Sequence, residues 1–284
     1  MPPEQLCRIP SCEHNDKSIA CILEHALCIG WNRNSYFSVQ PHSQIMCRLH
    51  VNNTMANKSA ASSLMLLLQL IQNKDWQKLH SIYFNHPDKY RSLAALINES
   101  SSFNGMTLLH AVCRFNPPSS VVKKMITLCP DDAKALDCLQ RTPLHVATGT
   151  GASVNVVNAL LEANPSACRA QDADGRTPLH MACDRNCVLF EGSINSNDAP
   201  RYDIVNSLLT QSPSSVTIED GDEMTAIEYA LLSSGDLKVV KMLQRASQKV
   251  LRKKHADEKM KKHKQQQQLA GFAPKDKVFS ARSA

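Results

Sequence analysis

The stretch Arg141–Ala147 reads RTPLHVA, and Arg176–Ala182, which lies 35 residues further on, reads RTPLHMA. An earlier copy, TLLH, begins at Thr107, 35 residues before Thr142, and a fourth copy, TAIEYALL, begins at Thr225. Recurrence at a fixed period of some tens of residues is the signature of a solenoid. The sequence is therefore predicted to fold as stacked units and not around one closed core.

Each copy is followed by a second apolar stretch with helical spacing. Val121, Val156 and Val239 begin valine-led stretches 14 residues after their threonines. Apolar residues at three- and four-residue intervals predict two short helices per unit. Such a unit cannot bury its apolar face alone, so neighbouring units must stack. The predicted fold is an all-α helix-turn-helix repeat solenoid with short β-turn or hairpin connections.

The third unit carries an insertion. Its second helix begins near Ile204, 27 residues after Thr177 instead of 14, which places 13 extra residues at about 187–201. A length change that leaves both helices intact belongs in a surface loop. The inserted segment, CVLFEGSINSNDAPRY (Cys187–Tyr202), is read either as a partner-contacting loop or as a tolerated length variant.

The repeated motif has a plain structural interpretation. Threonine can cap the first N–H groups of a helix, and proline is well suited to the first helical position. The histidine ring can bridge neighbouring groups and fix the turn between units. Asn104-Gly105 and Asp174-Gly175 are tight-turn dipeptides, whereas the second unit has Leu139-Gln140 at that place. Glu228 replaces the histidine in the fourth unit, which leaves the hairpin geometry of units two and four open.

The residues DADGRTPLHMAC (Asp172–Cys183) and LQRTPLHVAT (Leu139–Thr148) resemble ankyrin repeats, whose hallmark is T-P-L-H-x-A. The resemblance covers about residues 102–246, with units starting near 102, 137, 172 and 220, and extends weakly to residue 63. It implies a non-enzymatic protein-interaction scaffold that binds a protein partner on a concave face and needs no cofactor.

The resemblance also implies which positions contact the partner. They lie at the hairpin tips and on the inner helices, where aromatic and arginine side chains make plausible anchors. For Phe103 and Phe115 the alternative is that they cover the adjoining N-terminal cap. The implied positions are Phe103, Asn104, Met106, Arg114, Phe115, Cys138, Leu139, Arg141, Ala173, Asp174, Arg176, Asp184 and Arg185.

The flanking segments are predicted to differ from the repeats. Residues 1–62 form a largely irregular leader, and residues 63–101 form a degenerate helical capping unit. In that unit Leu64–Asn73 and Trp76–Asn85 are the expected helices, and His86–Tyr90 (HPDKY) resembles the NPSAC that ends a later unit. Residues 247–284 are expected to be a basic helical extension followed by a disordered tail, which begins after the polar run Gln265–Gln268.

No catalytic pattern accompanies the repeats. His110, His145 and His180 recur every 35 residues, so they occupy one niche in successive units, about 10 Å apart by the spacing of packed helices. One metal ion cannot be shared across that distance. The sequence shows no nucleophile–base pair, phosphate loop or paired acidic motif. We therefore expect no enzyme activity.

A competing hypothesis uses the N-terminal cysteines. Cys7, Cys12, Cys21 and His25 could close a tetrahedral zinc site. Cys47 and His50 could replace the second pair, and Cys28, His14 and His42 are further candidate ligands. Together with the basic tail, such a site would make the protein a zinc-dependent or nucleic-acid-associated nuclear regulator. The alternative is a poorly ordered leader without metal.

The positive charge is a property of the tail. The chain has a net charge of +6, and Arg245–Lys264 contains nine lysines and arginines against two acidic residues. This run is read as a solvated helix, a nuclear-import signal or a phosphate-binding arm. No aromatic residue interrupts it, so base stacking and a nucleic-acid partner are not expected.

The cellular setting follows from what the sequence lacks. It has neither an apolar run long enough to span a membrane nor a secretory signal peptide. Its 11 cysteines are an odd number, which argues against a complete disulfide framework. We expect a monomer in the cytoplasm, the nucleus or both, without a membrane partner.

Overall fold

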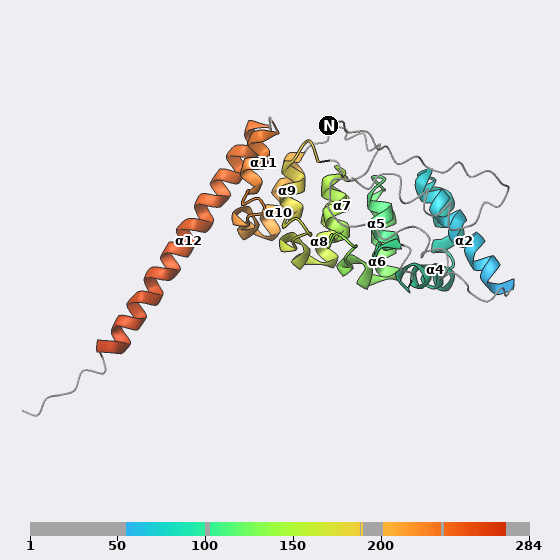
Figure 1. Cartoon of the computed structure of the whole chain (residues 1–284), viewed down its shortest axis with the longest axis horizontal. Coiled ribbons are helices and arrows are strands. Elements are labelled where there is room, and N and C mark those ends of the chain that lie inside the picture. Colours follow the sequence, from blue (N-terminus) through green and yellow to red (C-terminus); the bar gives the residue numbers. More distant parts are fainter. Residues whose placement is uncertain (1–54, 100–102, 188, 190–200, 234–235, 271–284) are drawn as a thin grey trace, which may run out of the picture.

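The computed structural model describes residues 55–99, 103–187, 189, 201–233 and 236–270. Figure 1 shows most of these residues as two parallel rows of short helices, from which one long helix projects. The order begins with α2 (Met55–Gln72), α3 (Trp76–Leu79), the π-helical turn η1 (His80–Phe84) and α4 (Pro87–Glu99).

Four two-helix units follow this N-terminal group. The inner row holds α5 (Leu108–Cys113), α7 (Pro143–Gly149), α9 (Pro178–Cys183) and α11 (Ala226–Leu232). Their outer partners are α6 (Ser119–Leu128), α8 (Val154–Ala163), α10 (Arg201–Gln211) and α12 (Leu237–Ala270). The first three outer helices lead into 3-10 turns, η3 (Pro130–Lys134), η4 (Pro165–Arg169) and η5 (Pro213–Thr217). The predicted all-α repeat fold is confirmed.

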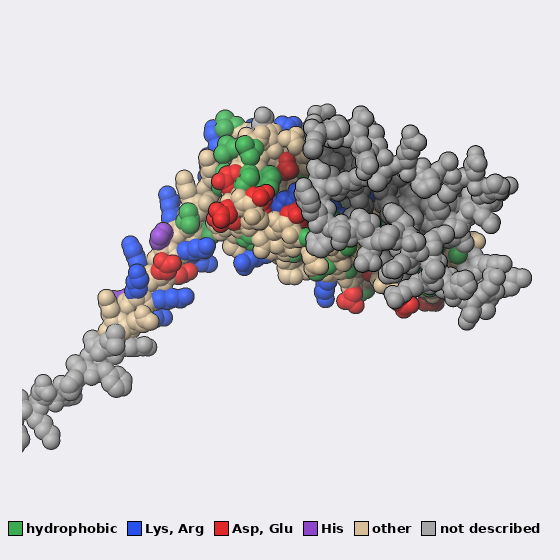
Figure 2. Space-filling view, in the orientation of Figure 1, with side chains coloured by type: hydrophobic (Ala, Val, Ile, Leu, Met, Phe, Trp, Pro, Cys, Tyr) green, Lys and Arg blue, Asp and Glu red, His purple; other side chains and the backbone are tan. Residues whose placement is uncertain are grey.

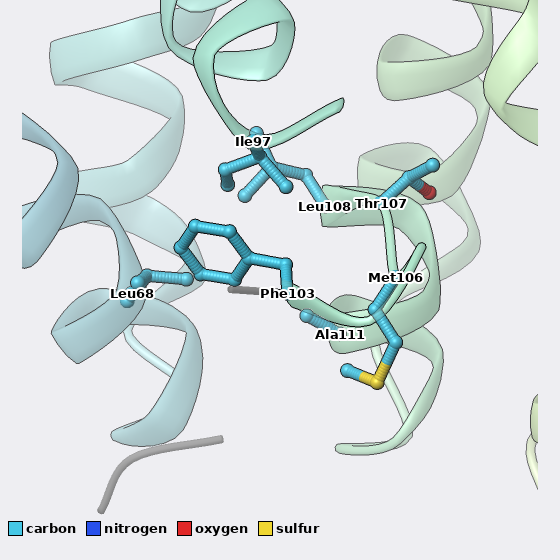
Figure 3. A pocket seen from close by; sticks show the side chains of 7 residues that line it. All are labelled: Leu68, Ile97, Phe103, Met106, Thr107, Leu108 and Ala111. Carbon is cyan, nitrogen blue, oxygen red and sulfur yellow. The ribbon is translucent and has the colours of Figure 1, made fainter. Parts of the chain in front are cut away.

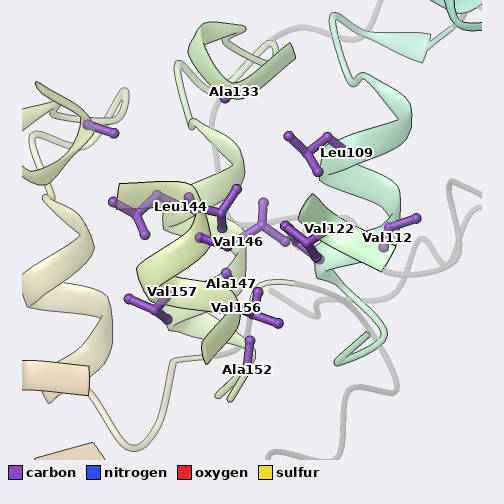
Figure 4. Packing of buried hydrophobic residues seen from close by; sticks show 14 of the residues in the cluster. Leu109, Val112, Val122, Ala133, Leu144, Val146, Ala147, Ala152, Val156 and Val157 are labelled. Atoms are coloured by element: carbon purple, nitrogen blue, oxygen red, sulfur yellow. The ribbon is translucent and has the colours of Figure 1, made fainter. Parts of the chain in front are cut away.

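Equivalent residues of successive units build one continuous core. On the inner helices, Leu109, Leu144 and Leu179 are each at most 1% exposed. On the outer helices, Val122 and Val157 are fully buried against them. Figure 4 shows these small aliphatic side chains meeting between the helices of neighbouring units. Short side chains allow the helices to lie close together, which is why so few aromatic residues suffice.

The N-terminal group differs from the expected helix pair. The first helix begins at Met55, ahead of the expected boundary at residue 63. His86–Tyr90 does not end the group, because Pro87 opens the 13-residue helix α4. Proline fits the first turn of a helix, and Asp88 in that turn complements the helix dipole. The likeness of HPDKY to NPSAC was therefore misleading.

The hairpin turns keep one geometry even where glycine is missing. Gly175 has a φ of +78°, and Gln140 and Glu223, at the equivalent positions, have φ values of +58° and +60°. The Oδ1 atom of Asp137 accepts hydrogen bonds from the backbone N–H groups of Leu139 and Arg141. These bonds hold the second turn closed without glycine. The turns of units two and four therefore have the same backbone geometry as the turn of unit three.

Substitution of Gly175 by alanine should lower the free energy of unfolding by about 1–3 kcal/mol, because a left-handed φ strains any Cβ-bearing residue. A Cβ at this position would also lie 2.7 Å from the backbone nitrogen of Gly221. The matched control is Gln140→Ala, where a Cβ is already accommodated at positive φ. Urea unfolding of both variants checks this expectation, and equal losses would contradict it.

Candidate functional site

Three inner helices, α5, α7 and α9, each begin with a threonine and a histidine that form a buried polar cluster. In the second unit, the Nδ1 atom of His145 accepts the backbone N–H of Thr142 at 3.0 Å and lies 2.9 Å from the threonine hydroxyl. Its Nε2 atom lies 3.1 Å from the carbonyl oxygen of Ala170 and 3.2 Å from that of Arg176. Because Nδ1 accepts, the proton resides on Nε2, which donates to the next unit.

The same bridge recurs along the stack. Nε2 of His110 reaches the carbonyl of Arg141 at 3.0 Å, and Nε2 of His180 reaches the carbonyl of Met224 at 3.1 Å. Each accepting residue directly precedes the threonine of the following unit. Within the described ranges, no group of three or more His, Cys, Asp or Glu side chains could hold a metal ion. The histidines thus join neighbouring units through hydrogen bonds from Nε2.

Burial keeps these rings neutral. Desolvation lowers the pKa of His110 and of His145 to about 4, although the bonds to backbone carbonyls oppose the shift. The pKa of His180 is also lowered by burial, and Asp220 opposes that shift. A protonated ring would lose the Nδ1 acceptor that caps the helix. Helix capping and unit stacking therefore depend on the same neutral imidazole.

The last unit uses a different side chain at this place. The Glu228 carboxylate accepts hydrogen bonds from the backbone N–H and the hydroxyl of Thr225. A carboxylate has no proton to give to the carbonyl of a following unit. Leu231 is 57% exposed, whereas its equivalents Cys113 and Cys183 are buried. The stack therefore ends here within the described chain.

An aspartate outside the repeated motif fixes the hairpin tips of units two, three and four. Asp137, Asp172 and Asp220 lie five residues before the threonines of units two, three and four. The Oδ1 atom of each accepts two backbone N–H groups of its own turn. The sequence contains this pattern as an aspartate that recurs five residues before each of these threonines.

The residues expected to contact a partner fall into three groups. Asn104, Cys138, Ala173 and Asp174 are exposed. Arg114, Phe115, Leu139, Arg176, Asp184 and Arg185 are half-buried. Phe103, Met106 and Arg141 are buried, so the expectation that they present exposed side chains is wrong.

Phe103 and Met106 are buried at the junction with the N-terminal group. Figure 3 shows the Phe103 ring pointing between Leu68 of α2 and Ile97 of α4. The cavity that they line with these residues measures about 10 Å³ and is almost wholly apolar. Such a space is too small for a ligand larger than a water molecule. Phe103 therefore covers the cap, which was the alternative interpretation for this residue.

Arg141 is buried because its own turn holds it. Its Nε atom donates to Asp137 Oδ2 at 2.8 Å, and both side chains are at most 4% exposed. The equivalent Arg176 is 25% exposed, and its Nη2 atom lies 3.1 Å from Asp174 and 3.5 Å from Asp172. Asp174 at the tip therefore draws the third-unit guanidinium outward, and unit two has Leu139 at that place.

The exposed tips change in charge along the stack. Unit two presents Cys138 and Leu139, whereas the tips of units three and four present Asp174, Asp222 and Glu223. Figure 2 shows acidic side chains gathered beside hydrophobic ones at the α11 end of the solenoid. From unit two to unit four the tips therefore change from uncharged and partly apolar to acidic.

The predicted zinc ligands Cys7, Cys12, Cys21 and His25 lie outside the described residues, so the zinc hypothesis stays a hypothesis. Most of the insertion lies outside them as well. Leu189, in its described part, is buried and packs against Gly149 of α7. A Cβ on Gly149 would collide with the Leu189 side chain. Among the described helices, none is both long and apolar enough to cross a membrane.

Comparison with known families agrees with the geometry. Residues 108–198 match a family model described as ankyrin repeats (3 copies). A search of curated proteins found no match to the sequence. The matched range begins at α5 and ends before α10, the second helix of the third unit. The fourth unit shares the turn, cap and helix order of the units before it.

Stability should fall as the pH drops from about 6.5 toward 4. The folded pKa of His110 and His145 lies below the ordinary value of 6.5, so the unfolded chain binds more protons in this window. The stabilisation is complete above pH 6.5 and is lost on acidification, by up to about 3 kcal/mol for each ring. Urea unfolding at a series of pH values measures the effect.

The control for this titration is His145→Ala. This variant should be less stable at neutral pH by about 2–4 kcal/mol, because it loses a helix cap and leaves a cavity. It should also lose less stability between about pH 6.5 and 5 than the parent, since one titrating ring is gone. An unchanged pH dependence would show that His145 does not titrate as assigned.

Proposed function

Because residues 108–198 match a model of ankyrin repeats, which generally mediate protein–protein interaction, we propose that the chain is a non-enzymatic scaffold. Its protein partner binds along the hairpin tips and the exposed edges of the inner helices, the concave face in this family. The observation that carries the proposal is the row of exposed tips, repeated from unit to unit and held in one register.

Backbone hydrogen bonds link each tip to the next. The N–H of Cys138 donates to the carbonyl of Asn104 at 2.7 Å, and that of Ala173 donates to Leu139 at 2.8 Å. Gly221 donates to Asp174 at 2.8 Å in the same way. A surface whose backbone is already fixed loses little conformational entropy on binding, which favours affinity. The tips are thus pre-organised for a partner that spans several units.

The chemistry of the tips defines the partner that we propose. An apolar segment suits Cys138 and the half-buried Leu139, whereas a basic segment suits Asp174, Asp222 and Glu223. Half-buried arginine and aromatic side chains lie beside this row and supply further contact area, namely Arg114, Phe115, Arg176 and Arg185. The partner segment is therefore apolar toward the second unit and basic toward the fourth.

The described hollows give no support to catalysis. An open groove of about 500 Å³ lies between α8 and α10 in the outer row, but its lining contains neither histidine nor cysteine. Its titratable side chain is Glu162, which is exposed to solvent and has no base or nucleophile paired with it in that lining. We therefore propose no enzymatic function.

A charge-reversal pair tests the placement of the binding surface. The variant Asp174→Arg/Asp222→Arg places two cations at the tips of units three and four, where a basic partner would be repelled. The expected result is that proteins captured from an extract of the source cells by the immobilised parent are captured at least about tenfold less by this variant. Quantitative mass spectrometry of the captured proteins measures the ratio.

The matched control reverses the same charges on the outer row. Glu162 and Asp203 are exposed on α8 and α10, and Glu162→Arg/Asp203→Arg changes the net charge by the same amount. This control should retain the partners of the parent chain. Partners that resist the tip variant, or that are lost equally with the control, would show that the binding surface lies elsewhere.

A further inference from the structure

The last helix carries a continuous basic stripe on the face that points away from the solenoid. The stripe consists of exposed residues spaced three or four apart along α12, so that they share one helix face. The residues of the stripe are Lys238, Lys241, Arg245, Lys249, Arg252, Lys259 and His263, with Ala256 completing the series. Over this length the stripe extends about 37 Å.

The direction of the stripe follows from the buried side of the same helix. Val239, Val240 and Leu243 are buried against the other helices of the last units. By helical spacing they lie on the face opposite Lys241 and Arg245. After Val250, every residue from Leu251 to Gln267 is exposed, and Figure 1 shows this part projecting from the solenoid.

The acidic residues of α12 do not lie on the stripe. Asp257 and Glu258 fall on the opposite side, beside Lys254 and Lys261. None of the ion pairs found among the described residues involves α12. Figure 2 shows lysine and arginine side chains along the projecting part. One face is thus purely cationic, whereas the other is mixed.

Contrary to the expectation from the sequence, which rested on the lack of aromatic residues for base stacking, we propose that this stripe binds the phosphate backbone of double-stranded nucleic acid without regard to base sequence. Its length matches about one turn of duplex, which is 34–36 Å. Contacts between regularly spaced cations and phosphates gain affinity through counterion release and need no apolar anchor. The absence of aromatic residues from the stripe excludes base stacking, which is how single strands are gripped. The proposal is independent of the scaffold function.

Other anionic partners fit the stripe less well. Helices that lie on a membrane present a broad apolar face beside their cations. Between Leu251 and Gln267, the large exposed apolar residues are Leu251 and Met260, and helical spacing places them on different sides. An acidic protein surface would also require buried anchors, since most binding energy comes from such residues. The stripe provides charge and spacing alone.

The test uses the full-length chain and a fluorescent duplex of about 20 base pairs, which is two helical turns. Fluorescence anisotropy gives the dissociation constant between about 50 and 200 mM salt. Six cations predict a plot of log K against log salt with a slope of about −5. A second duplex of unrelated sequence should give the same result. A chain that shows no salt-dependent binding to either duplex overturns the proposal.

Two variants with the same change in charge locate the binding face. Arg252→Gln/Lys259→Gln removes two stripe cations and should weaken binding about 10- to 100-fold at 0.1 M salt, with a slope shallower by about 2. Lys254→Gln/Lys261→Gln removes two cations seven residues apart on the opposite face and should change both values far less. Circular dichroism confirms that the helix persists in each.

Two outcomes would overturn the assignment. Equal losses in the two variants would show that the stripe is not the binding face. Tighter binding to phosphatidylserine vesicles than to duplex, at matched phosphate concentration, would identify a membrane surface as the partner. Capture of partners by the hairpin tips is measured separately, so failure of this proposal leaves the scaffold proposal standing.

Discussion

The structure depends on a neutral imidazole that serves two units at once. Through Nδ1, His145 caps the helix that contains it, and through Nε2 it donates to the carbonyl that precedes the next threonine. Beginning a helix and joining it to its neighbour are therefore one interaction. Because both contacts are buried, losing the ring would leave unsatisfied polar groups in two units, and such groups are costly. A single unit therefore leaves this interaction incomplete and depends on its neighbours for stability.

The surface is positioned by these buried groups. The carbonyl that accepts from Nε2 ends the hairpin, while an aspartate at the start of the same hairpin holds its N–H groups. Each tip is thereby fixed from both sides, although its outward side chains make few contacts of their own. Exposed residues such as Ala173 can consequently vary in chemistry without disturbing the stack. Binding specificity and stability are carried by different positions of one unit.

The sequence predicted the period, the helix order and the structural role of the histidines, because these follow from residue types at fixed spacing. It could not separate Arg141 from Arg176, which occupy the same motif position. Their burial differs because Asp174 stands beside one guanidinium and Leu139 beside the other. Phe103 was likewise ambiguous, since its burial depends on α2 and α4, whose packing no repeat pattern encodes. The repeated motif therefore does not predict contacts that involve elements or side chains outside the motif.

The two proposed binding surfaces have opposite charge, and their separation keeps them independent. The tips of units three and four are acidic, whereas the exposed part of α12 from Leu251 onward is basic. At a rise of 1.5 Å per residue, Lys259 lies about 12 Å beyond Leu251 along the helix. The Debye length is about 8 Å at physiological salt, so Lys259 lies more than one Debye length beyond the start of the projecting part. A compact basic tail folded back on the tips would neutralise both surfaces. The continuous helix α12 prevents this by holding its distal cations, from Arg252 onward, away from the solenoid.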